Sequence, residues 1–77
     1  MNTGELFGDV VKRRREAAKL SQEALADRAG LHRTYISLLE RGRRVPSIEV
    51  VRKLALALDT TMVSLVGSLE RRLYGSP

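Results

Sequence analysis

The chain has 77 residues, no cysteine and a formal net charge of +5, and its length limits it to one domain, residues 1–77, whose small core would gain from pairing with a second copy. Disulfides and cysteine-based metal sites are excluded, and without a signal peptide or a long apolar run we expect a cytoplasmic protein that does not enter a membrane. The basic charge favours a polyanionic partner but also fits an ordinary soluble surface, and one Phe with two Tyr are too few for the stacking platforms of single-strand or RNA binders.

The first predicted element is a helix from about Leu6 to Ala18, after a frayed start at residues 1–4. The basic run KRRRE follows at 12–16; its first two residues are expected in solvent, whereas Arg14 and Arg15 fall on the buried side or its flank. Apolar residues at helical spacing mark the inner face of this helix: Phe7, Val10, Val11 and Ala18.

Residues 21–40 predict two short helices joined by a tight turn. Ser21 can cap the first helix with its hydroxyl, and Gly30 can end it by taking a positive φ. The second helix is expected from near His32 to Arg41, ended by Gly42. Its buried side carries Ile36 and Leu39, and the opposite side is polar, small and basic, as suits a groove lined by base edges: Thr34, Ser37, Leu38 and Arg41.

Two further helices are expected after a loop at 43–47. Ser47 can cap the fourth helix, which runs to Leu58 with an apolar stripe at Ile48, Val51, Leu54, Ala55 and Leu58. The fifth helix begins near Met62 after a cap at Thr60 or Thr61, and the segment 67–77 either extends it or forms a tail.

The fifth helix carries more apolar residues than a chain of this length is expected to bury. Symmetric dimers are the commonest closed assemblies, so these residues predict a homodimer interface, with a role in the subunit's own core as the alternative. They are Met62, Val63, Leu65, Val66 and Leu69.

The run LSQEALADRAGLHRTYISLLERGRRVPS resembles the helix-turn-helix of the lambda repressor and Cro superfamily, the XRE family. Within it, AGLHRTYISLLERGRR looks most like the controller proteins of restriction–modification systems. The resemblance covers about residues 6–66 and rests on the glutamine opening the first helix, Ala-Gly at the turn and Ile-Ser-x-x-Glu-Arg-Gly closing the second. It implies an all-α, five-helix, lambda-repressor-like DNA-binding domain whose second and third helices form the motif.

This resemblance makes the third helix the recognition helix. Arg33, Thr34, Ser37 and Leu38 are the candidates for contacts with base edges. Arginine can bond O6 and N7 of guanine together, short side chains permit close approach, and leucine can touch a thymine methyl. The alternatives are a phosphate contact for Arg33 and a merely exposed Leu38.

Phosphate contacts are expected from Gln22, Tyr35, Arg43 and Arg44. Gln22 opens a helix, where backbone N–H groups attract phosphates, although glutamine is also a common helix-start residue. Tyr35 either reaches a phosphate or packs on the helix pair. Arg43 and Arg44 lie along the sugar–phosphate backbone or form an ordinary charged loop.

Two structural features follow from the same resemblance. Relatives pair a basic residue at the position of Arg15 with the glutamate at the position of Glu40, so we expect this ion pair between the first and third helices, with a solvent-facing Glu40 as the alternative. Lys19 stands where the family usually has glycine; if it ends the first helix in the left-handed region, it carries a strain of about 1 kcal/mol.

These features predict a homodimeric transcription regulator that binds double-stranded DNA at a near-palindromic operator, with restriction–modification control as one possible setting. The alternatives are an antitoxin, a phage-type repressor, or an interaction module of the same fold that reads no DNA. We expect no enzyme, cofactor, metal or small-molecule ligand, because the sequence has no phosphate-binding loop, metal-ligand cluster or nucleophile–base pair.

Overall fold

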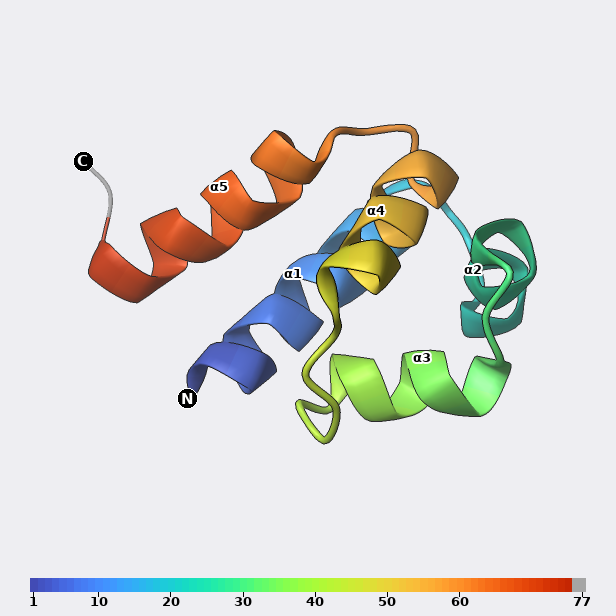
Figure 1. Cartoon of the computed structure of the whole chain (residues 1–77), viewed down its shortest axis with the longest axis horizontal. Helices are drawn as coiled ribbons and strands as arrows, with labels where there is room; N and C mark the ends of the chain where they lie inside the picture. The colour runs from blue at the N-terminus through green and yellow to red at the C-terminus, as the bar shows by residue number, and fades with distance from the viewer. Residues whose placement is uncertain (76–77) are drawn as a thin grey trace.

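The computed structural model describes residues 1–75 as five α-helices, with no strand among them (Figure 1). The expected all-α, five-helix class is confirmed. Helix α3 lies along one side of the molecule, and the start of α1 and the end of α5 lie toward the opposite side (Figure 1). The helices span Thr3–Ala17 (α1), Gln22–Ala29 (α2), Arg33–Glu40 (α3), Ile48–Ala57 (α4) and Met62–Tyr74 (α5).

Side-chain caps set most of the helix starts. Ser21, Ser47 and Thr61 each accept a hydrogen bond from the backbone N–H three residues later, at 3.0, 3.2 and 3.0 Å. These bonds satisfy N–H groups that have no partner inside the helix. The expected caps are confirmed, with Thr61 rather than Thr60 opening α5.

The start of α1 differs from the prediction of a frayed segment. Asn2 Oδ1 accepts from the backbone N–H of Glu5 at 2.8 Å, and Glu5 Oε1 accepts from that of Asn2 at 3.0 Å. This reciprocal capping box lets α1 begin at Thr3. At the other end of the chain, α5 continues to Tyr74, and residues 76–77 of the expected extension lie outside the described residues.

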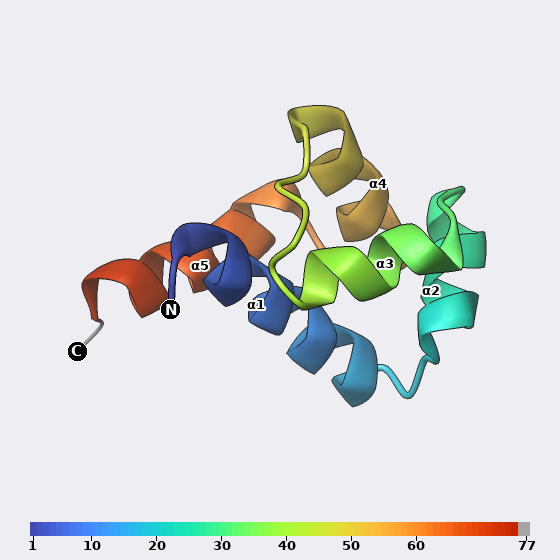
Figure 2. The same cartoon turned by 90° about the horizontal axis from the view of Figure 1, so that it is seen from below.

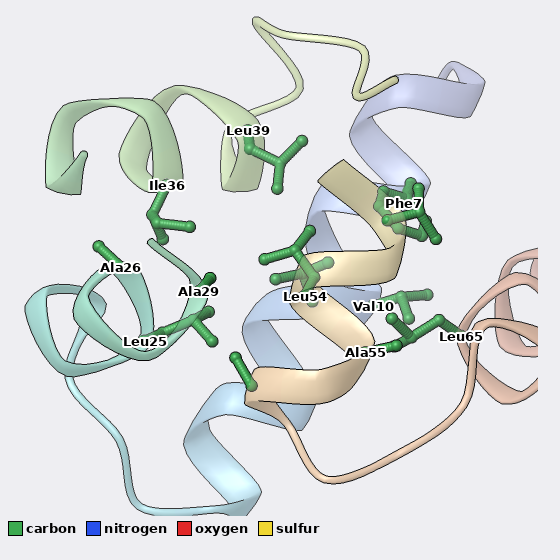
Figure 3. Packing of buried hydrophobic residues seen from close by; sticks show 13 residues of the cluster. Phe7, Val10, Leu25, Ala26, Ala29, Ile36, Leu39, Leu54, Ala55 and Leu65 are labelled. Carbon is green, nitrogen blue, oxygen red and sulfur yellow. The ribbon is translucent and has the colours of Figure 1, made fainter. Parts of the chain in front are cut away.

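Apolar side chains from all five helices form one core (Figure 3). Two residues assigned to inner faces are exposed instead. Ala18 lies beyond the last turn of α1, and Ile48, at the first position of α4, is 72% exposed. Each sits at a helix end, where helical spacing no longer keeps a side chain over the core. The fully buried large residues are Val11, Leu25, Ile36, Leu39, Leu54 and Leu65.

Two glycines permit close backbone contacts that the sequence analysis did not foresee. Gly8 is buried where α1 crosses the end of α3, and a Cβ there would lie 2.7 Å from the carbonyl oxygen of Glu40 and closer still to that of Leu39. Gly42 has φ of 76°, and a Cβ there would lie 2.7 Å from Cα of Glu5. The N-terminal half of α1 therefore packs directly on the backbone that ends α3.

Lys19 takes the left-handed conformation that the sequence analysis considered, with φ of 59°. Its N–H donates to the Glu16 carbonyl, and the N–H of Leu20 donates to the Arg15 carbonyl at 3.1 Å. This paired arrangement closes α1 and normally uses glycine at the left-handed position. A lysine there costs about 1–2 kcal/mol relative to an unstrained residue.

Helix α5 is attached to α1 by polar contacts as well as by the buried side chain of Leu65. Arg14 donates to Oγ of Ser64 at 2.9 Å and to Oγ of Ser68 at 2.8 Å. Nearer the end of α5, Arg72 donates to Asp9 at 2.7 Å. Hydrogen bonds from Arg13 and Arg72 lower the pKa of Asp9 below its ordinary value of 3.8.

We predict that Gly8→Ala destabilises the protein by about 1–3 kcal/mol, because the new methyl group meets backbone carbonyls that cannot rotate away. Gly4→Ala, in the same helix, is the control, since a Cβ at Gly4 has ordinary contacts, the nearest at 3.4 Å. Urea unfolding followed by circular dichroism measures both free energies. Equal stability of the two variants would contradict the close packing of α1 on α3.

Candidate nucleic-acid interface

Helices α2 and α3 form a compact helix-turn-helix. Gly30 ends α2 with φ of 66°, and the N–H of Leu31 donates to the Ala26 carbonyl at 2.8 Å. Ala26 and Ala29 are buried, and their small side chains let the two helices approach closely. Figure 2 shows α3 in front of the other helices, with its outer side uncovered.

The exposed side of α3 carries the predicted base-contacting residues. Arg33 and Thr34 are exposed, while Ser37 and Leu38 are half-buried. On the opposite side, Ile36 and Leu39 are fully buried in the core. The structure therefore brings these four candidates together on one accessible strip, which we call the α3 ridge (Arg33, Thr34, Ser37 and Leu38).

The four predicted phosphate-contacting residues differ in their surroundings. Arg43 and Arg44 are exposed in the loop after α3, whereas Gln22 and Tyr35 are half-buried. Tyr35 packs against the core, and this burial raises the pKa of its phenol, against the opposing effect of the Arg44 charge. Part of the Tyr35 side chain is therefore used in packing, and Arg43 and Arg44 are the most exposed of the four residues.

Arg15 and Glu40 form the predicted ion pair between α1 and α3. Arg15 Nε and Nη2 donate to the two carboxylate oxygens of Glu40 at 2.7 and 3.0 Å. The side chains are only 11% and 3% exposed, so Glu40 does not face solvent. Hydrogen bonding to Glu40 raises the pKa of Arg15, so the guanidinium remains charged.

Glu40 also holds Gln22, a contact that the sequence analysis did not foresee. Gln22 Nε2 donates to Glu40 Oε1 at 3.1 Å, and Arg15 Nη1 donates to the Leu20 carbonyl just before α2 at 2.9 Å. One carboxylate and one guanidinium therefore connect α1, α2 and α3. No signal in the sequence predicted the Gln22–Glu40 contact, because spacing along one helix does not reveal which residues of two helices face each other.

A second surface feature lies on α4 and α5. Val63 and Val66 of α5 are 82% and 43% exposed and lie beside the exposed Ile48 of α4. Met62 and Leu69 are half-buried against the core. We call this the α4–α5 apolar surface (Ile48, Met62, Val63, Val66 and Leu69).

Leu65 requires a correction. It was assigned to a dimer interface, but its side chain is fully buried in the core of the subunit itself. A second copy cannot reach it. The helical spacing placed Leu65 near the apolar stripe of α5 but did not reveal which side of the stripe faces α1.

Among residues 1–75, no cluster of histidine, aspartate and glutamate side chains is suited to hold a metal ion. Within the same residues, no helix combines the length and apolar character that a membrane crossing requires.

Comparisons with known proteins agree with this architecture. A helix-turn-helix family model, HTH_3, matches residues 11–65. The control protein C.BamHI of Bacillus amyloliquefaciens is 38% identical over 73 residues, covering 87% of this chain and 90% of that protein. The restriction–modification controller protein C.AhdI from Aeromonas hydrophila superposes with a TM-score of 0.78 at 43% identity, over 79% of this chain and 92% of that one.

A second solved structure shows a related protein on its target. The restriction–modification controller protein C.Esp1396I, as a tetramer in complex with its natural 35 base-pair operator, has a TM-score of 0.86 and 27% identity to this chain. The match covers 95% of this chain and 96% of that one.

We predict that Arg15→Met costs about 3–5 kcal/mol of folding free energy, because it leaves the Glu40 carboxylate buried without its partner. The double variant Arg15→Met/Glu40→Met removes both charges and should recover most of this loss. Chemical denaturation of the two variants measures the difference. If the free energy of unfolding of Arg15→Met lies within about 1 kcal/mol of that of wild type, the Glu40 carboxylate is compensated by water or by Gln22.

Proposed function

We propose, because this chain belongs to the helix-turn-helix family of transcription regulators, that it binds double-stranded DNA as a homodimer and regulates transcription by occupying a near-palindromic operator. The observation that carries the proposal is the α3 ridge, an exposed strip on a helix whose other side is fixed in the core. A helix so placed can enter the major groove without rearrangement of the fold.

The ridge supplies different chemistry along its length. Arg33, in the first turn of α3, has a guanidinium suited to bidentate bonding with O6 and N7 of guanine. Thr34 and Ser37 are short enough to let the helix approach base edges, and Leu38 offers an apolar contact to a thymine methyl. We assign direct base readout to these four residues, with Arg33 as the largest contributor.

Phosphate contacts flank the ridge on both sides. One N–H of the Gln22 amide donates a hydrogen bond to Glu40. Its second N–H can donate to a phosphate at the start of α2, where the helix dipole favours an anion. Arg43 and Arg44 follow α3 in the loop and add salt-dependent affinity. Tyr35 feels the charge of Arg44, and its hydroxyl is the remaining phosphate donor.

The α4–α5 apolar surface supports the homodimer. Contiguous exposed apolar side chains on a small basic domain indicate a partner surface, and a twofold pair would bury this surface against its own copy. Two recognition helices would then enter successive major grooves about 34 Å apart. Val63 and Val66 are the central contacts, with Ile48 beside them.

Similarity to the controller proteins supports a role in timing the expression of a restriction–modification operon. An antitoxin or phage-type repressor would have the same fold, and neighbouring genes for an endonuclease and methyltransferase, or for a toxin, separate these settings. The proposed activity is binding in the cytoplasm and requires no catalysis, cofactor or small-molecule ligand.

Selection of bound sequences from a random duplex library tests the proposal. We expect a near-palindrome whose half-sites have centres about one helical turn apart or a multiple of it. The chain's own upstream DNA, used in a gel shift, is the natural comparison. Failure to enrich any sequence, together with no retardation at low salt, would favour an interaction module that reads no DNA.

Arg33→Ala and Arg43→Ala should affect DNA binding differently. Loss of Arg33 should weaken the selected operator by about 1–3 kcal/mol and relax the preference for guanine at one position. Loss of Arg43 should weaken all duplexes alike and reduce the slope of log K against log salt by about 1. Titrations at several salt concentrations measure both effects, and equal loss of specificity in the two variants would contradict the assigned roles.

Val63→Asp should disrupt the homodimer, because it places a charge at the centre of the α4–α5 apolar surface. Leu56→Asp is the matched control: Leu56 is 68% exposed on α4 and does not belong to that surface. Sedimentation analysis should show a monomer at micromolar concentration for Val63→Asp alone. Dissociation of both variants, or of neither, would place the interface elsewhere.

A further inference from the structure

His32 is the only histidine of the chain and caps the recognition helix. Its Nδ1 accepts a hydrogen bond from the backbone N–H of Thr34 at 3.2 Å. The caps of α2, α4 and α5 use the hydroxyls of Ser21, Ser47 and Thr61. The imidazole therefore performs a task that a much smaller side chain performs at the other helices.

The hydrogen bond from Thr34 identifies Nδ1 as the accepting nitrogen of the ring. A backbone N–H only donates, so Nδ1 must be free of a proton in order to accept from it. The neutral imidazole then carries its proton on Nε2. Among residues 1–75, the bond to Thr34 is the one hydrogen bond of this side chain, so the Nε2–H group is available as a directed donor.

The position of His32 places this donor beside the α3 ridge. The side chain is exposed and immediately precedes Arg33 and Thr34, two of the proposed base-contacting residues. It borders a shallow hollow with Leu31 and with Glu23 and Asp27 of α2. The recognition helix begins here, and this is the end that reaches base edges in helix-turn-helix proteins.

We infer that His32 is a DNA-contacting residue that donates from Nε2 to an acceptor on the duplex, either a phosphate oxygen or a base-edge acceptor such as guanine N7. The inference rests on the proposed function. It assigns the ring two tasks at once: Nδ1 fixes the first turn of α3, and Nε2 binds DNA. The cap holds the ring in the orientation that the contact needs, so little side-chain freedom is lost on binding.

The proposed contact uses the uncharged ring, because a proton on Nδ1 would prevent it from accepting the bond from Thr34. Glu23 and Asp27 border the same hollow and repel phosphates, while Arg33, the next residue along the chain, attracts them. An uncharged N–H donor adds a directed hydrogen bond and releases no counterion. Its loss should therefore lower affinity without changing the salt dependence of binding.

Two amide variants separate the tasks of the ring. In His32→Asn, Oδ1 replaces Nδ1 as the cap, and no group reaches the position of Nε2. In His32→Gln, the longer side chain carries an N–H donor to about the position of Nε2, but glutamine is a poor cap. Both replacements are uncharged, so their comparison isolates the donor from the cap.

We expect His32→Asn to keep the melting temperature of wild type and to bind the selected operator about three- to tenfold more weakly, the effect of one neutral hydrogen bond. His32→Gln should melt about 4–8 °C lower yet bind more tightly than His32→Asn. The slope of log K against log salt should equal that of wild type in both. Isothermal titration and thermal unfolding of the full chain provide these values.

The choice of duplex identifies the acceptor. An equal loss for His32→Asn on the operator and on an unrelated duplex indicates a phosphate oxygen, and a loss confined to the operator indicates a base edge. Wild-type affinity for His32→Asn on both duplexes would overturn the inference and leave His32 as a cap only. Absence of binding by wild type in the same titrations would instead overturn the proposed function.

Discussion

The structure depends on one buried contact, the bidentate ion pair between Arg15 and Glu40. Glu40 is the last residue of α3, and Arg15 lies near the end of α1, so the pair fixes α3 to the longest helix among the described residues. Gln22 joins the same carboxylate from the start of α2. A charge buried in this way is stable only when every partner is in place, which makes the geometry of three helices interdependent.

Helix α1 serves as the support for both surfaces of the molecule. On one side, Gly8 lets it press against the backbone that ends α3. On another, Arg14 extends toward the hydroxyls of Ser64 and Ser68 and secures α5. The α3 ridge and the α4–α5 apolar surface do not need to touch each other, because each is attached to the same helix.

Local rules recovered much of this from the sequence. Caps at Ser21, Ser47 and Thr61 and the turn at Gly30 depend on residues within one helical turn, and such signals are read directly from the chain. The start of α1 follows the same rule through the pairing of Asn2 with Glu5, in place of the predicted frayed segment. The Arg15–Glu40 pair was predicted from the resemblance combined with helical spacing. The side of α3 that carries the ridge was predicted from the helical period alone.

The remaining features depend on which helix faces which. The need for glycine at position 8 arises only from the crossing of α1 and α3. Leu65 is a core residue only because α5 lies against α1. Ile48 fits the apolar period of α4, yet it stands at the first position of the helix, where no neighbour covers it. Spacing along one helix contains no information on the crossing partner, so these assignments required coordinates.

The fastening of α5 by hydroxyl groups around Arg14 has a mechanical consequence for the proposed dimer. Directional hydrogen bonds resist sliding of α5 more than an apolar contact does, since a shifted helix would leave the Arg14 guanidinium without its acceptors. The distance between the two α3 helices of the proposed dimer would therefore be fixed. Such a dimer would tolerate a substitution within an operator half-site better than the insertion of a single base pair between the two half-sites.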